Sequence, residues 1–143
     1  DCAVVGTFIT LIDEAGEVIG TNQYETTDEA IRSRILIRNQ FANSSVLMRT
    51  SALQQTDGYR ALTNAEDFEL FLQLGHIGTF ANLPTRALAY RVRAGGVSRN
   101  FYKTLPNVRR VIWQHRHHYP HDWLGYLKYT LRWWLASLQN VFR

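Results

Sequence analysis

Residues 63–75 read TNAEDFELFLQLG, in which two adjacent acids, Glu66 and Asp67, stand in front of an apolar run. The spacing of the apolar residues predicts a helix with a buried face. With Asn64 as its N-cap, Asp67 falls at the third helical position, and Gly75 ends the helix. The positive end of a helix favours an ionised carboxylate, so Asp67 can serve as a cap or as a base that takes a substrate proton.

Strand-like and helix-like segments alternate around this stretch. Residues 2–12 are rich in β-branched side chains and lead through a turn to a returning strand at 17–20. Residues 26–39 predict a helix, because a threonine N-cap and acids precede Ile31 and Ile35, which share one face. This interleaving favours an α/β fold, with a mixed sheet covered by helices, over an all-helical or all-β fold.

Four shorter segments complete the pattern. Residues 43–49 predict a short buried strand, and residues 50–58 a short helix closed by a glycine. Two strands are expected on either side of Pro84, at 77–84 and 86–93.

Composition limits the class of protein. A chain of 143 residues forms one domain that can bury a sizeable core. Its single cysteine, Cys2, cannot form an internal disulfide, which is typical of a reducing compartment. The sequence holds no long uncharged apolar run and no signal-peptide pattern, so we expect a cytoplasmic protein. Because it starts without Met and inside a strand-like pattern, we expect it to be part of something longer.

Charge divides the chain near Asn100. Residues 1–100 carry nine arginines against eleven acids, whereas residues 101–143 carry seven lysines or arginines against a single acid, Asp122. We therefore expect a body, 1–100, followed by a basic, aromatic, helical tail, 101–143.

The tail contains an amphipathic helix over residues 122–143. Its leucines recur at helical spacing beside three tryptophans and a few basic residues. These leucines are Leu124, Leu127, Leu131, Leu135 and Leu138. Two interpretations stay open: the apolar face packs on the body or on a partner chain, or it lies on an anionic membrane surface on the cytoplasmic side.

Four histidines, His115, His117, His118 and His121, gather in the tail. Pro120 interrupts a helix there, and neither a cysteine nor a paired acid completes a usual metal ligand set. We interpret the group as a solvated surface cluster and not as a metal site.

Four motifs in order resemble the C-terminal half of a family 2 glycosyltransferase of the GT-A fold. They are the strand and Gly-Tyr turn within 43–60, the acidic "ED" helix start within 65–74, the "YR" strand with its Gly-Ser ending within 78–99, and the upstream segment 4–20. The resemblance covers about residues 3–99. It implies a partial GT-A-like fold, the acceptor-side half, followed by the helical tail.

This resemblance implies transfer of a sugar from a nucleotide-sugar donor to the hydroxyl of a saccharide or lipid-linked acceptor, with inversion, in polysaccharide or glycoconjugate synthesis. Asp67 matches the family's catalytic base, and Glu66 is its supporting neighbour. The matching strand and turn place Asn43, Ser44 and Tyr59 among the substrate-binding residues.

The chain departs from the family at two positions. Gln73 stands where the family often has an arginine, and Arg93 where it often has a histidine that helps to hold the metal and diphosphate. Arginine does not ligate metals, but it neutralises a diphosphate by bidentate hydrogen bonds. The resemblance therefore assigns donor contacts to Arg91, Arg93 and Arg99, with Ser98 beside them.

The family's Asp-x-Asp metal motif does not occur in this sequence. We expect a divalent metal, Mg or Mn, to belong to the complete enzyme and to be held outside this chain. The chain alone is then expected to be inactive.

Two other classes of function stay open. One is a noncatalytic glycan-binding or assembly module with a membrane- or partner-binding tail. The other is nucleic-acid binding, which is disfavoured because the basic residues are sparse and separated by leucines. We also expect self-association through an exposed sheet edge or through the tail.

Overall fold

The computed structural model describes residues 1–62, 64–93 and 101–141. In chain order its elements are β1 (Cys2–Ile12), β2 (Val18–Asn22), α1 (Asp28–Ile35), the 3-10 turn η1 (Asn43–Ser45), β3 (Leu47–Met48), α2 (Thr50–Leu53), α3 (Glu66–Ile77), β4 (Thr79–Arg91), α4 (Phe101–His115) and α5 (Asp122–Val141). The predicted α/β class is confirmed.

The sheet is built on β1. This strand pairs in parallel with β4 over nearly its whole length. It pairs antiparallel with β2 near its end, where Ile9 faces Asn22, and antiparallel with β3 near its start, where Val4 faces Met48. Because β4 occupies one edge of β1, β2 and β3 share the opposite edge.

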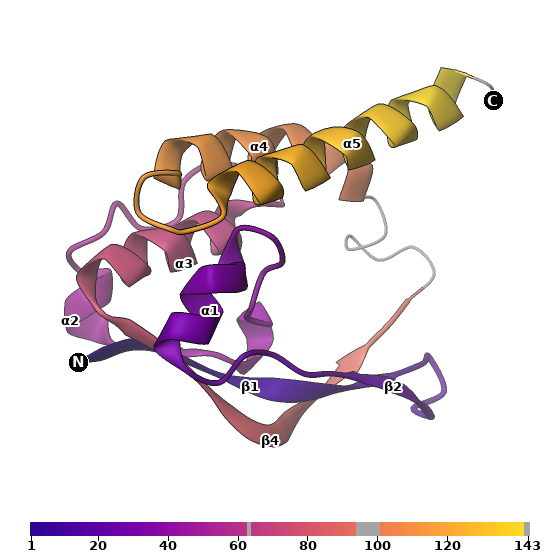
Figure 1. Cartoon of the computed structure of the whole chain (residues 1–143). Coiled ribbons are helices and arrows are strands. Elements are labelled where there is room, and N and C mark those ends of the chain that lie inside the picture. The colour runs from indigo at the N-terminus through magenta and orange to yellow at the C-terminus, as the bar shows by residue number, and fades with distance from the viewer. Residues whose placement is uncertain (63, 94–100, 142–143) are drawn as a thin grey trace.

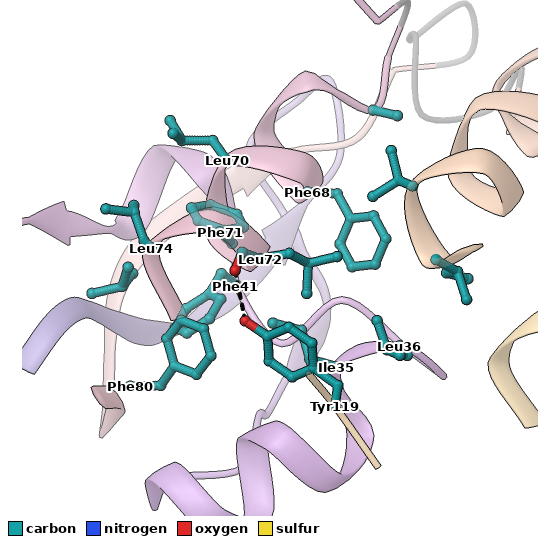
Figure 2. Close-up of a cluster of buried hydrophobic side chains, with 14 of the residues drawn as sticks. Ile35, Leu36, Phe41, Phe68, Leu70, Phe71, Leu72, Leu74, Phe80 and Tyr119 are labelled. Carbon is teal, nitrogen blue, oxygen red and sulfur yellow. Dashed lines mark hydrogen bonds between the residues drawn. The ribbon is translucent and has the colours of Figure 1, made fainter. Parts of the chain in front are cut away.

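The helices cover one face of this sheet. Figure 1 shows α1 and α3 above the strands, and α4 and α5 lying side by side above them. Phe41, Phe71 and Phe80 pack with ring centroids 5.0 and 5.3 Å apart at the centre of the core. In Figure 2 the Tyr119 hydroxyl donates to the carbonyl of Leu72, at 2.7 Å.

Helix α1 begins as predicted but ends at Ile35, short of the expected residue 39. The Thr27 side chain accepts from the amide of Ala30, and Ile31 and Ile35 are fully buried on one face. Asp28 then links α1 to the sheet, because one of its oxygens accepts from the amide of Phe80 at 2.8 Å while the other pairs with Arg32 at 2.8 Å.

Two further predicted elements are shorter than expected. The prediction of a buried strand over 43–49 is wrong, because residues 43–45 form η1 and only Leu47 and Met48 form a strand, β3. Leu47 is 78% exposed. The helix predicted over 50–58 ends at Leu53, and Gly58 adopts a left-handed φ of 68° in the loop that follows.

The two strands expected around Pro84 are a single strand, β4. Leu83 pairs with Thr7 and Arg86 pairs with Phe8, so Pro84 lies in an irregularity between two regular stretches. Proline is tolerated there because β4 pairs only with β1 among the described strands and needs fewer amide donors.

The tail shares the core of the body. Leu105, Val108, Val111 and Ile112 of α4 and Tyr129 of α5 belong to the same buried cluster as Leu72. The expected division near Asn100 falls on residues outside the described ranges, and the hydrophobic core continues beyond it. Sequence reasoning anticipated α5 but did not resolve α4 as a separate helix.

Candidate functional site

The acidic pair occupies the first turn of α3. This helix begins at Glu66 with Ala65 as its N-cap and ends at Ile77, so the predictions that Asn64 caps it and that Gly75 ends it are wrong. Asn64 has a left-handed φ of 57°, which turns the chain just before the helix. Asp67 is therefore the second helical residue, and its Oδ1 accepts from the amide of Phe68 at 2.7 Å.

The environment of Asp67 disfavours its negative charge. Burial, with a smaller contribution from neighbouring Glu66, raises the pKa of Asp67 above its ordinary value. Oε2 of Glu66 is buried and has no hydrogen-bond partner among the described residues. A buried carboxylate oxygen without a donor is costly, and a catalytic role is one of the recognised explanations for it.

A second polar cluster surrounds Glu69, one turn further along α3. Glu69 is fully buried, and its Oε1 lies 3.3 Å from a guanidinium nitrogen of Arg60 and 3.3 Å from Nε2 of His115. Its other oxygen accepts from the side-chain amide of Gln73. Gln73 Oε1 also accepts from the amide of Asp57 at 2.8 Å, so this cluster anchors the loop before α3.

Two further histidines extend the cluster toward solvent. Nδ1 of His115 lies 3.2 Å from Nε2 of His76, and the ring of His76 stacks on that of His118 at 3.9 Å. Burial lowers the pKa of His115. Partial desolvation, together with His118 and His115, lowers the pKa of His76 to about 4, so both rings are neutral near pH 7.

Because both rings are neutral, a donor and an acceptor can be assigned in each hydrogen bond between them and Glu69. His115 Nε2–H donates to Glu69, so His115 Nδ1 must accept, and His76 Nε2–H donates to it. This arrangement leaves Nδ1 of His76 as a hydrogen-bond acceptor at the outer end. The chain from Glu69 to His76 is therefore suited to receive a hydroxyl donor from a ligand.

A cavity of about 420 Å³ opens over this second cluster. Much of its polar lining can both donate and accept hydrogen bonds, namely Gln55, Thr56, Gln73, His76 and Gln114. Arg60 adds donors, and Asp57 and Glu69 add acceptors. Glu69, Gln73 and His76 follow each other along one face of α3, whereas Asp67 does not line the cavity. The two polar groups of α3 are thus separate features.

Three other predicted site residues lie in exposed segments before α3. Asn43 and Ser44 are exposed on η1, where neither forms the expected strand, and Tyr59 is 57% exposed in the loop before α3. Within the described part of the chain, no hydrogen bond or ion pair joins Asp67 to Asn43, Ser44 or Tyr59.

Two of the predicted donor-side residues, Arg91 and Arg93, lie at the end of β4. The Arg91 guanidinium donates to the carbonyls of Asp13 and Glu14 at 2.8 Å each, which fixes the β1–β2 turn. Arg93 follows the strand and is exposed. Ser98 and Arg99 lie outside the described residues.

One of the four tail histidines is buried, contrary to the predicted solvated cluster. His117, His118 and His121 are exposed, but His115 is buried against Glu69. In the described ranges no group of three or more His, Cys, Asp or Glu side chains is placed to hold a metal ion.

Sequence reasoning missed the cluster around Glu69. Glu69, Gln73 and His76 have the spacing of one helical face within an apolar helix, and this was the available signal. Nothing comparable marks Arg60 or His115, which reach Glu69 from distant parts of the chain.

Comparison with known proteins identifies no relative. No protein-family model matches the chain, and no curated protein matches it.

Proposed function

We propose that this chain is the acceptor-side part of a nucleotide-sugar-dependent glycosyltransferase, in which Asp67 is the base for the acceptor hydroxyl. The observation that carries the proposal is the acidic pair in the first turn of α3, where burial raises the pKa of Asp67 and one oxygen of Glu66 is buried without a donor. The ordered motifs that resemble family 2 glycosyltransferases supply the reaction class.

The proposed step is a single displacement. The Asp67 carboxylate takes the proton of the acceptor hydroxyl, and the oxygen attacks the anomeric carbon of the donor sugar. The bond to the diphosphate breaks as the new bond forms, so a nucleoside diphosphate leaves and the configuration inverts. A base whose pKa lies closer to the working pH transfers protons more efficiently, which suits the raised pKa of Asp67.

Glu66 is the supporting residue in this proposal. Its Oε2 is buried and has no hydrogen-bond partner among the described residues, so a sugar hydroxyl would have to displace neighbouring side chains to donate to it. Arg93 and Ser98 remain proposed donor contacts. Arg91 already donates to two carbonyls of the β1–β2 turn. It can bind the donor diphosphate only if it gives up these hydrogen bonds.

The expected divalent metal does not fit the described residues. They hold no group of three candidate ligands, and the side chain at the position of the family histidine is Arg93. None of the steps above depends on a metal held by this chain.

A noncatalytic glycan-binding module is the second candidate. It is favoured by the cavity beside Glu69, whose amides and His76 offer both donors and acceptors to sugar hydroxyls without a strong net charge. In that case saccharide would bind to the cavity and no donor would be consumed.

The two functions are separated by measuring nucleoside diphosphate release. The full-length protein is incubated with UDP-, GDP- and dTDP-sugars, with and without a membrane lipid extract or oligosaccharides as acceptors. Release that depends on both a donor and an acceptor supports transfer. Saccharide binding seen by NMR, without release from any donor, supports the binding module.

A further inference from the structure

One face of α5 is used to pack on the body. A side-chain carbon at Gly125 would lie 2.5 Å from the carbonyl oxygen of Leu36, so the helix backbone approaches the end of α1 closely. On the same face Tyr129 is buried, and Lys128 Nζ donates to the carbonyl of Ile37 at 2.7 Å.

Three of the five leucines predicted to form the apolar face, Leu127, Leu131 and Leu135, lie elsewhere. Trp123, Leu127, Leu131 and Leu135 follow each other at four-residue spacing and are 62, 48, 51 and 55% exposed, and Trp134 beside them is 57% exposed. At 3.6 residues per turn this row lies on the side of α5 away from Gly125 and Tyr129. In Figure 1 the C-terminal end of α5 also extends beyond the other elements.

Helix α4 continues this apolar row. Its Trp113 is 56% exposed and shares an apolar groove of about 290 Å³ with Trp123 and Leu127. We call these residues the aromatic stripe: Trp113, Trp123, Leu127, Leu131, Trp134 and Leu135.

The surroundings of the aromatic stripe are cationic. Between Thr104 and Leu135 the sequence carries five lysines or arginines and one acid, Asp122. Around Trp113, Arg109 and Arg110 line a shared cavity, Arg110 is exposed, and the Arg116 guanidinium lies over the Trp113 ring, 4.0 Å from its centroid. Lys128 and Arg132 lie toward the body, beside Tyr129. None of the described helices is long and apolar enough to cross a bilayer.

These charges distinguish between two possible partners of the aromatic stripe, a second copy of the chain and a lipid surface. A second copy of the chain would bring the same cationic edge against itself in a symmetric pair, which is repulsive. An anionic lipid surface instead attracts the cations and accepts indole rings at the level of its headgroups.

We propose that the aromatic stripe docks the protein on an anionic bilayer surface, with α5 lying in the headgroup region. Docking leaves the Gly125 and Tyr129 face on the body, so the fold does not change. The proposal does not depend on sugar transfer.

The test uses vesicles of phosphatidylcholine alone and vesicles that also contain phosphatidylglycerol. The intact chain is compared with the triple variant Trp123→Ser, Leu127→Ser, Trp134→Ser in a flotation assay. Substitution is preferable to deletion of the helix, because deletion would also remove the buried Tyr129. Val18→Ser, Ile19→Ser on β2 is the matched control, since those side chains are 67 and 55% exposed.

The expected result is flotation of the intact chain and of the control with phosphatidylglycerol vesicles only, weakened by salt, and at least about a tenfold loss for the triple variant. All four tryptophans lie on α4 and α5, so brominated lipid should quench the intrinsic fluorescence of the intact chain. Equal flotation of the intact chain and the triple variant, or none of either, would overturn the proposal. So would a dimer that dissociates only in the triple variant.

Discussion

Nε2 of His115 lies 3.3 Å from Oε1 of the fully buried Glu69, and this contact joins α4 to α3. The same oxygen also faces Arg60 at 3.3 Å, so a loop, α3 and the tail meet at one carboxylate. A basic tail that looks separable by charge is therefore held to the body by a buried polar cluster as well as by apolar packing.

Replacing this carboxylate should destabilise the whole chain. Glu69→Ala removes the partner of His115, Arg60 and Gln73 and is expected to lower the free energy of unfolding by about 2–3 kcal/mol. Urea denaturation measures the loss. Glu29→Ala, an exposed acid on α1, is the control and should change stability by less than about 0.5 kcal/mol. Equal small losses for both variants would show that the cluster contributes no stability.

Stability should fall in mild acid because of the histidines. The pKa of His76 is about 4 in the folded chain and 6.5 at its ordinary value, so the unfolded chain binds more protons between these limits. The free energy of unfolding therefore decreases as the pH falls from 6.5 to about 4. The lowered pKa of His115 acts in the same direction.

The matched variants are His76→Gln and His117→Gln. His76→Gln should flatten the pH dependence measured by urea unfolding across this window. His117 is exposed, and its replacement should leave the slope unchanged. A wild-type slope in His76→Gln would mean that the ring is not held neutral.

Asp67 and Asp28 should contribute differently to the free energy of unfolding. Because the pKa of Asp67 is raised, its charge costs stability at neutral pH, and that cost is relieved as the pH falls through the raised pKa. Asp67→Asn keeps an acceptor for the amide of Phe68, so it should not lower stability. Asp28→Asn weakens the Arg32 pair and should cost about 1–3 kcal/mol.

Thermal unfolding at neutral pH compares these variants. A larger loss for Asp67→Asn than for Asp28→Asn would indicate that Asp67 is a structural acid, and would weaken its proposed role as the base.

The close approach at Gly125 should not tolerate a side chain. Gly125→Ala places Cβ against the Leu36 carbonyl and is expected to cost about 1–3 kcal/mol, although alanine is the better helix former. Gly20→Ala is the control, since its nearest neighbour would be Leu11 Cδ1 at 3.7 Å. Limited proteolysis of α5 provides the readout, and unchanged protection in Gly125→Ala would contradict this packing.

Sequence reasoning succeeded where the signals were local. The Thr27 cap with Ile31 and Ile35 predicted α1, and leucine spacing predicted α5. It failed at Asn64, because a left-handed turn moved the helix start by one residue.

Long-range geometry was not available to sequence reasoning. Leucine spacing could not show that α5 packs through Gly125 and Tyr129, with Leu127, Leu131 and Leu135 outside. Likewise the contacts of Glu69 with Arg60 and His115 depend on the fold and not on any local pattern.

The most direct test of the central claim is the rate of sugar transfer by Asp67→Asn in the full-length protein, measured with the donor that supports nucleoside diphosphate release. Loss of a general base predicts a fall in kcat of roughly 10²- to 10⁴-fold, with folding intact and with Glu29→Gln fully active. A kcat for Asp67→Asn close to that of the wild type would remove Asp67 from the role of base and contradict the proposed function.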